Sequence, residues 1–187
     1  MSAASTVQPT AKTAWNLDPA HSVAEFKVKH MMISNVKGKF SGLTGSLTFD
    51  ETDLSRSAVQ AAIPMATITT GDDQRDGHLK SPDFFHAEQH PEMTFKSTAI
   101  AVKQPGELAV TGDLTIHGVT QSVVFDVEGP TPPAKDPWGN LRVGLSATTK
   151  INRKDFGLTW NAALETGGVL VGEDVTITLD VQFIKAQ

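Results

Sequence analysis

Alternation of apolar and polar residues runs through most of this chain, and a period of two is typical of strands with one buried face. In residues 175–183, Val, Ile, Leu, Val and Phe alternate with Thr, Thr, Asp and Gln. Similar runs, separated by Gly-, Asn-, Asp- and Pro-rich turns, make up about eight strands. The pattern predicts an all-β fold, an eight-stranded antiparallel barrel, with a two-layer sandwich as the competing architecture.

One segment, residues 70–91, lacks this alternation and carries helix signals instead. Asp72 or Asp73 can cap a first short helix, and Ser81-Pro82-Asp83 places proline at the first position of a second. The sequence therefore predicts a short helical insert, at about 72–90, that covers one opening of the barrel.

Composition excludes several classes of protein. The chain has 187 residues and no cysteine, so it suits one domain without disulfides, thiolate metal sites or cysteine nucleophiles. The formal net charge of -5 lacks the basic surface that a nucleic-acid binder needs, so no nucleic-acid partner is expected. Its apolar runs are too short for a membrane span, which predicts a soluble protein without stable membrane insertion.

The small, polar N-terminus predicts a disordered tail at residues 1–14, followed by a single domain at 15–187. The tail lacks a basic start and an apolar stretch, the two parts of a secretory signal. We therefore expect a cytoplasmic protein if this N-terminus is native, and a mature periplasmic form is the alternative.

The positions that alternation points inward mix large and small side chains: Phe26, Phe40, Phe49 and Phe95 beside Ala24, Gly45, Ala61 and Gly112. An eight-stranded barrel is just wide enough to be filled by side chains or to hold one small ligand. Glycines on its strands either form bends and bulges or leave room for a ligand. If room is left, the walls favour an apolar chain, because each buried methylene contributes about 0.8 kcal/mol.

Polar side chains near the predicted openings can bind a ligand head group or stabilise the fold. Strand parity points His30 inward, where its imidazole can bond a ligand head group or a buried carbonyl. Arg75 can form an ion pair with Asp76, or it can face the mouth with His78 and bind an anionic head group. Arg153 and Asp155 are expected to form an ion pair that fixes a turn.

Three further histidines lie outside the predicted ligand contacts, and two of them have a spacing compatible with metal binding. His86 and His90 have the i, i+4 spacing of a metal-binding pair on a helix. No third ligand is evident nearby, and Pro91 ends the segment, so we expect no metal. His117 lies in a tight Ile-His-Gly-Val turn, where we expect it to be exposed or locally bonded.

Several phrases in this order resemble the YceI-like family of bacterial polyisoprenoid-binding proteins, from about Trp15 to the end of the chain. They are DPAHS at 18–22, FKVKH at 26–30, VKGKF at 36–40, RDGHL at 75–79, SPDFF at 81–85, HPEMTF at 90–95, GDLTIHGVT at 112–120 and INRKDFG at 151–157. The resemblance implies a lipocalin-like barrel with a long pocket for isoprenoid quinones, polyprenyl chains or similar amphiphiles. Family members are mostly periplasmic. His86 departs from the family pattern, which usually has an acid there.

The alternation and the resemblance together give a set of candidates for ligand contact. They are Phe26, Val28, His30, Phe40, Leu43, Ile68, Arg75, His78, Phe84, Phe85, Phe95, Leu114, Ile116, Phe156 and Trp160.

The sequence therefore favours a protein that binds and carries or sequesters a long apolar lipid. No nucleophile elbow, phosphate-binding loop or dinucleotide fingerprint is present, so we expect neither an enzyme nor a cofactor. One alternative is a lipid hydrolase or isomerase that uses His30 with Arg75 or His78. Another is an interaction module with a filled core. A homodimer is compatible with exposed strand edges, although nothing requires one.

Overall fold

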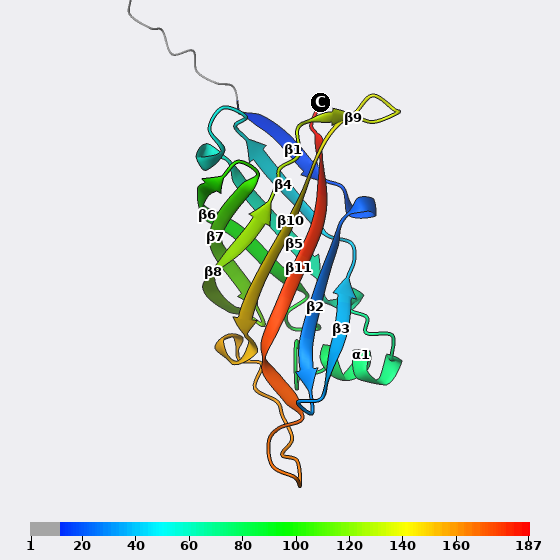
Figure 1. Cartoon of the computed structure of the whole chain (residues 1–187). Coiled ribbons are helices and arrows are strands. Elements are labelled where there is room, and N and C mark those ends of the chain that lie inside the picture. Colours follow the sequence, from blue (N-terminus) through cyan, green and yellow to red (C-terminus); the bar gives the residue numbers. More distant parts are fainter. Residues whose placement is uncertain (1–11) are drawn as a thin grey trace, which may run out of the picture.

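The computed structural model describes residues 12–187, a strand-rich barrel with one α-helix at its side (Figure 1). The strands are β1 (Thr13–Leu17), β2 (Val23–His30), β3 (Ser34–Phe40), β4 (Thr44–Phe49), β5 (Ala58–Pro64), β6 (Glu92–Gln104), β7 (Glu107–Ile116), β8 (Val119–Glu128), β9 (Ala134–Lys135), β10 (Leu141–Asn152) and β11 (Val171–Lys185). The helix is α1 (Asp73–Lys80), and short 3-10 turns are η1 (Pro19–His21), η2 (Leu54–Arg56), η3 (Met65–Thr67) and η4 (Arg153–Phe156).

Eight of these strands close into the barrel that the alternation predicted. They run in the order β11-β1-β4-β5-β6-β7-β8-β10, and pairing between β10 and β11 closes the ring. Neighbours in the sheet are antiparallel. Short hairpin turns join β6 to β7 and β7 to β8, whereas the connections between the other neighbours are longer and the insert lies between β5 and β6. Closure removes the free edges that an open sheet would expose. The predicted barrel is thus confirmed, in preference to the sandwich.

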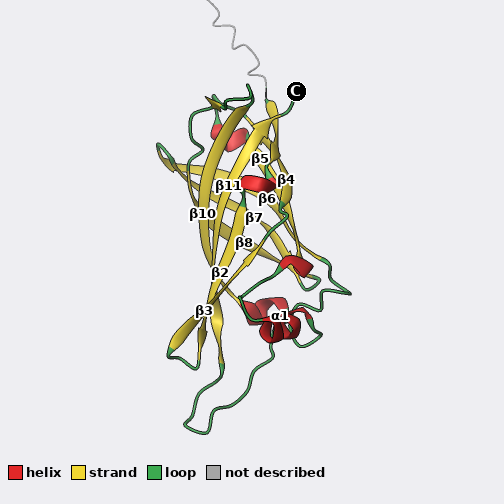
Figure 2. Ribbon diagram, turned by 90° about the vertical axis from the view of Figure 1, so that its right-hand side faces the viewer, coloured by secondary structure: helices red, strands yellow, loops and turns green. Residues whose placement is uncertain are grey.

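The β2–β3 hairpin widens one end of the barrel. The C-terminal part of β11 pairs with β1, from Leu17↔Phe183 to Trp15↔Lys185, while its N-terminal part pairs with β2. The outer strand of the hairpin, β3, reaches the rest of the chain through an isolated bridge, Lys39↔Thr69. The wall is therefore open beside β3, and α1 with the turns after it lies across this opening (Figures 1 and 2).

The insert contains one helix instead of the predicted two. Asp72 caps α1 by accepting a hydrogen bond from the backbone N–H of Arg75 at 2.9 Å. The residues after Ser81 form a series of turns that fold back onto the helix, for example through the N–H of Phe85 bonded to Leu79 at 3.0 Å. His86 has a φ of +47°, which no α-helix accommodates, so the second predicted helix was wrong.

The N-terminal boundary also differs from the prediction. β1 begins at Thr13, so Thr13 and Ala14 belong to the barrel and not to the predicted tail. The remainder of that tail, residues 1–11, lies outside the described residues. Within residues 12–187, no helix has both the length and the apolar character needed to cross a bilayer.

Two inward glycines accommodate aromatic rings and leave no empty space. A Cβ on Gly38 would lie 2.3 Å from the ring of Phe26, its partner across the β2–β3 ladder. A Cβ on Gly112 would lie 2.4 Å from the ring of Phe95 and 2.5 Å from the carbonyl oxygen of Lys96. The idea that Gly112 leaves room for a ligand is therefore wrong, because the Phe95 ring already occupies that space.

Candidate functional site

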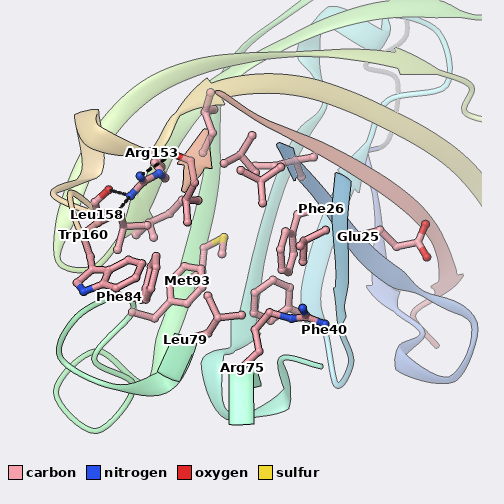
Figure 3. Close-up of a pocket in the computed structure, with 18 of the residues that line it drawn as sticks. Glu25, Phe26, Phe40, Arg75, Leu79, Phe84, Met93, Arg153, Leu158 and Trp160 are labelled. Carbon is pink, nitrogen blue, oxygen red and sulfur yellow. Dashed lines mark hydrogen bonds between the residues drawn. The ribbon is translucent and has the colours of Figure 1, made fainter. Parts of the chain in front are cut away.

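An apolar cavity of about 220 Å³ lies at the widened end of the barrel, between the β2–β3 hairpin, β11 and the insert (Figure 3). Phe26 and Phe40 face it from the hairpin, with ring centroids 5.8 Å apart. Phe84 and Trp160 form the opposite side, with centroids 5.3 Å apart. Glu25 borders the cavity, but its carboxylate points away from it in Figure 3. The wall that a ligand would touch is almost wholly apolar.

A second apolar compartment of about 130 Å³ continues toward the other end of the barrel. Ile63, Met93 and Ile177 line both compartments and form the boundary between them. The two compartments thus share a wall made of these three side chains.

Most residues that the sequence predicted as ligand contacts lie at these two compartments. The first is lined by Phe26, Val28, His30, Phe40, Arg75, His78, Phe84, Phe85, Ile116 and Trp160. The second is lined by Leu43, Phe95 and Leu114. Ile68 and Phe156 line neither compartment; they are buried in the surrounding core and support the wall from behind.

Sequence reasoning missed other parts of the wall. Val175 and Ile177 on β11 line the first compartment, and their alternation could have placed them there. Leu158 and Leu170 also line it, from the two ends of the long loop before β11. That loop has no periodic pattern from which an inward position could be predicted.

Aromatic rings close one side of the cavity mouth. The His78 imidazole packs edge-on against Phe84 and Trp160, with centroid distances of 5.1 and 4.7 Å. Its Nε2 is 2.9 Å from a carboxylate oxygen of Asp83. The acid and the two rings thus hold His78 in one orientation at the mouth.

Arg75 does not form the expected ion pair with Asp76. Its Nε donates to the hydroxyl of Thr70 at 2.7 Å, and Nη2 approaches the Thr70 carbonyl at 3.4 Å. Asp76 accepts from the backbone N–H and the hydroxyl of the same Thr70, at 2.8 and 2.6 Å. Although burial opposes ionisation, these hydrogen bonds keep the pKa of Asp76 below its ordinary value. Thr70 separates the two charges, which leaves Arg75 exposed at the rim.

The expected pair of Arg153 with Asp155 is also wrong. The buried Arg153 guanidinium donates to the carbonyl oxygens of Leu158 at 2.6 Å, Trp160 at 2.9 Å and Gly172 at 2.8 Å, with a longer bond to Val171. Burial lowers the pKa of Arg153, and the nearby Glu173 carboxylate partly offsets this effect. The fork of Arg153 therefore ties the loop before β11 to η4, and Arg153 itself lines the cavity (Figure 3).

His30 points toward the cavity as strand parity predicted, and it lines the wall beside Val171. Among residues 12–187 its imidazole has no hydrogen-bond partner, so the bond to a buried carbonyl, which was the alternative role for His30, is not formed. The ring nitrogens remain available to a polar group entering the mouth.

Comparison with known proteins supports the resemblance seen in the sequence. A sequence profile of the YceI-like domain matches residues 15–183. The chain belongs to the YceI-like family. A UPF0312 protein of Staphylococcus aureus (strain bovine RF122 / ET3-1) is 40% identical to it over 172 residues, which cover 91% of this chain and 97% of the relative.

Solved structures place this YceI-like chain among barrels of the same fold. Burkholderia cenocepacia BcnA superimposes with a TM-score of 0.76 at 25% identity, over 89% of this chain and 98% of BcnA. A polyisoprenoid binding domain from Saccharophagus degradans, implicated in plant cell wall breakdown, has a TM-score of 0.69 over 94% of this chain and 100% of that domain. Its 18% identity supports the shared fold alone.

In this YceI-like chain, the interior of the site is apolar and its mouth carries polar and charged side chains. Its interior offers dispersion contacts and burial of apolar surface, which discriminate ligands by length and bulk. Its mouth offers the imidazole of His30, the guanidinium of Arg75 and the oriented imidazole of His78. The arrangement suits an amphiphile with a long apolar chain and a small polar end.

Proposed function

We propose that this chain binds one long-chain, polyisoprenoid-like lipid in the barrel and carries or sequesters it without changing it chemically. The observation that carries this proposal is the apolar cavity of about 220 Å³, together with the second compartment that shares its Ile63, Met93 and Ile177 walls. A polyisoprenoid binding domain from Saccharophagus degradans has the same fold, and the ligand class in its name is the one that we propose for this cavity.

The energetics favour a branched, flexible apolar chain. Each methylene transferred from water into the cavity contributes about 0.8 kcal/mol, so several isoprene units provide a large gross gain. Much of this gain offsets the lost freedom of ligand and side chains, so affinity grows less than proportionally with length. The ligand's apolar end would then extend past Met93 toward the second compartment.

The polar end of the ligand would stay at the mouth. His30 offers a nitrogen as donor or acceptor, and Arg75 keeps donors that its bonds to Thr70 leave unused. A hydroxyl, a quinone carbonyl or a phosphate fits these groups. The apolar interior would select for chain length, and the mouth for the head group.

Binding without turnover is favoured over the enzyme hypothesis by the same residues. An imidazole that acts as general base is usually oriented by a third group, and His30 has no such partner among residues 12–187. His78 does have a carboxylate, Asp83, but it is packed between two aromatic rings. The ligand should therefore leave the cavity unchanged.

The proposal is tested by titrating the purified, delipidated protein with geranylgeraniol and following tryptophan fluorescence. Trp160 lines the cavity, Trp15 is buried in the core and Trp138 is exposed, so a Trp160→Phe variant identifies the responding residue. We expect saturable binding, weakened about tenfold or more by Val175→Phe, which fills the cavity. Val124→Phe, at an exposed position of β8, is the matched control and should bind normally.

Two outcomes contradict the proposal. If the wild type does not bind the alcohol, or Val175→Phe binds as tightly as Val124→Phe, the cavity is not the binding site. Mass spectrometry of the extracted alcohol after incubation tests the claim that the protein carries the lipid without changing it chemically. A reaction product whose formation is lost in His30→Ala would establish catalysis instead.

A further inference from the structure

Three imidazoles from two separate parts of the chain meet on the outside of the barrel, next to the cavity mouth. His86 and His90 lie in the turns after α1, and His117 lies between β7 and β8. One ring nitrogen of each lies within 4.8 Å of the others. The ring centroids of His90 and His117 are 4.9 Å apart, and those of His86 and His90 are 6.1 Å apart.

The backbone holds two of these rings in conformations that side chains usually avoid. His117 has a φ of +54° and His86 a φ of +47°, both in the left-handed region. His117 and Gly118 are the two central residues of the β7–β8 hairpin turn, a position at which Asn-Gly is favoured. A strained backbone at a cluster of chemically capable side chains points to a function for the cluster.

The backbone around the cluster also leaves room for the His90 and His117 rings to approach each other. A Cβ on Gly118 would lie 2.8 Å from Cε1 of His90, so the glycine gives this ring room to approach His117. The backbone N–H of His90 donates to the carbonyl of His86 at 2.9 Å, a turn that puts both rings on the same side. The three residues are each half-buried, which leaves the cluster open to ions from solvent.

The His117 ring also lies next to the turn that follows η4. An ideal Cβ on Gly157 would lie 3.4 Å from Nδ1 of His117. Burial and the neighbouring His90 lower the pKa of His117.

We propose that His86, His90 and His117 bind one divalent transition-metal ion, with Zn²⁺ as the best fit. Imidazole nitrogen suits zinc and its neighbours copper and nickel, whereas Ca²⁺ and Mg²⁺ require oxygen ligands. Zinc binds histidine at about 2.0–2.1 Å, so tetrahedral ligand nitrogens lie roughly 3.4 Å apart. The cluster, with nitrogens within 4.8 Å, reaches this geometry by modest side-chain rotation, and water completes the site.

The site would join the turns after α1 to the β7–β8 hairpin, just beyond the end of the β6–β7 pairing at Thr94↔Thr115. Phe84 and Phe85, in the same turns as His86, line the cavity, and so does Ile116, which precedes His117. A metal at the cluster would thus fasten the insert to the β7–β8 hairpin at the edge of the cavity. Binding to the folded state alone would also raise the Tm of the protein.

The test is isothermal titration of metal-free protein with Zn²⁺, with native mass spectrometry to count the ions bound. We expect one Zn²⁺ per chain in the wild type. His117→Asn should weaken binding at least tenfold while the turn survives, because Asn tolerates a positive φ at this position. His21→Asn is the matched control: His21 is exposed and bonded to Asp18, and the variant should bind as the wild type does.

Circular dichroism and thermal unfolding of the metal-free variants establish that both remain folded. Titration with Mg²⁺ should give no heat of binding, because Mg²⁺ prefers oxygen ligands and the cluster offers imidazole nitrogens. The proposal is overturned if the wild type binds no zinc, if His117→Asn binds it equally well, or if His21→Asn loses as much affinity as His117→Asn. The last result would mean that scattered surface histidines bind the ion.

Discussion

Aromatic rings packed over glycines set the shape of the barrel interior at the residue scale. Phe95 covers Gly112 and Phe26 covers Gly38, so in each pair a ring edge occupies the place of the missing Cβ. Both rings also line the apolar compartments of the barrel. The inward positions of both phenylalanines followed from alternation, whereas the pairing of ring with glycine depends on register, which the sequence alone does not specify.

Replacing Gly112 by alanine should destabilise the protein. The new Cβ would lie 2.4 Å from the Phe95 ring and 2.5 Å from the Lys96 carbonyl oxygen, and the oxygen belongs to backbone that cannot easily move. We expect a loss of about 1–3 kcal/mol in the free energy of unfolding, measured by urea denaturation.

Gly77→Ala is the matched control for this substitution. Gly77 lies within α1, and a Cβ there would have no atom within 4 Å, so alanine should stabilise the protein by up to about 1 kcal/mol. Equal stability of the Gly112→Ala and Gly77→Ala proteins would show that the Phe95 contact does not constrain β7.

Arg75 should determine the preference for an anionic head group. Its guanidinium is exposed at the mouth and only partly used by Thr70. Arg75→Ala should weaken binding of geranylgeranyl phosphate about tenfold more than binding of the neutral alcohol, because a charge-assisted bond is lost only with the phosphate. Competitive titration of the two ligands measures this ratio.

Arg56→Ala provides the control for the change in net charge. Arg56 lies in η2, outside the cavity lining, and pairs with Asp50. Removing it should leave the ratio of phosphate to alcohol affinity unchanged. If both variants reduce phosphate binding equally, overall charge and not the position of Arg75 accounts for the effect.

At the scale of elements, the cavity exists because β11 changes neighbours along its length. It pairs with β1 near its end and with β2 before that, so the β2–β3 hairpin enlarges one end of the barrel. Alternation predicted these strands, but not which strand pairs with which part of β11, since long-range pairing is set by tertiary packing. The same limit explains the His86, His90 and His117 cluster: the i, i+4 pair was visible in the sequence, whereas the third imidazole arrives from a distant hairpin.

In the insert, one of two helix-start signals in the sequence predicted the structure correctly and the other did not. Asp72 and the residues after it correctly predicted α1. Ser81-Pro82-Asp83 is an equally good helix start, yet turns form there because the segment packs Phe84 and Phe85 against the cavity and returns to β6. Tertiary contacts outweighed propensity in this segment.

Arg153 should hold the loop before β11 in place. Its planar guanidinium serves carbonyls on both sides of the loop at once, and the single ammonium group of lysine does not reproduce that fork. We expect Arg153→Lys to destabilise the protein by about 1–3 kcal/mol and to speed amide hydrogen exchange in residues 158–172. Mass spectrometry of deuterium uptake measures the local change.

Lys154→Ala tests whether any change in this turn has the same effect. Lys154 is next in sequence but forms an exposed ion pair with Glu173, at 2.6 Å. Such pairs contribute little, so exchange in the loop should stay near the wild-type rate. Faster exchange in both variants to the same extent would argue against a special role for the Arg153 fork.

At the scale of the whole molecule, a group of ion pairs holds segments of the chain together at the barrel end opposite the cavity mouth. Arg142 on β10 donates to Asp18 at 2.6 Å and to Asp136 at 2.7 Å, and so connects three segments of the chain. The hydrogen bond from Arg142 is the main cause that lowers the pKa of Asp18 to about 2, against 3.8 for the free side chain. The pKa of Asp136 is lowered as well, mainly by the same arginine.

These depressed pKa values predict how stability depends on pH. A carboxyl whose pKa is lower in the folded state contributes stability above its unfolded value, and that contribution is lost as pH falls through the folded value. For Asp18, the loss should therefore develop between about pH 4 and pH 2. The urea concentration at the midpoint of unfolding should therefore decrease as the pH is lowered from about 4 to about 2.

Asp18→Asn should lower the midpoint at neutral pH, because a charged hydrogen bond of about 1–3 kcal/mol is weakened. The same variant should then lose less stability than the wild type between pH 4 and pH 2. Parallel curves for the two proteins would contradict the link between this carboxyl and acid sensitivity.

The central claim, that the barrel holds a long apolar lipid, is tested most directly by native mass spectrometry of protein purified without detergent, followed by organic extraction and lipid identification. The structure predicts one apolar amphiphile per chain that extraction recovers unchanged. Val175→Phe should carry less of it, whereas Val124→Phe should carry the wild-type amount. Protein that is free of lipid and takes up none from added polyprenol would contradict the account, because the cavity would then be an unoccupied gap in the core.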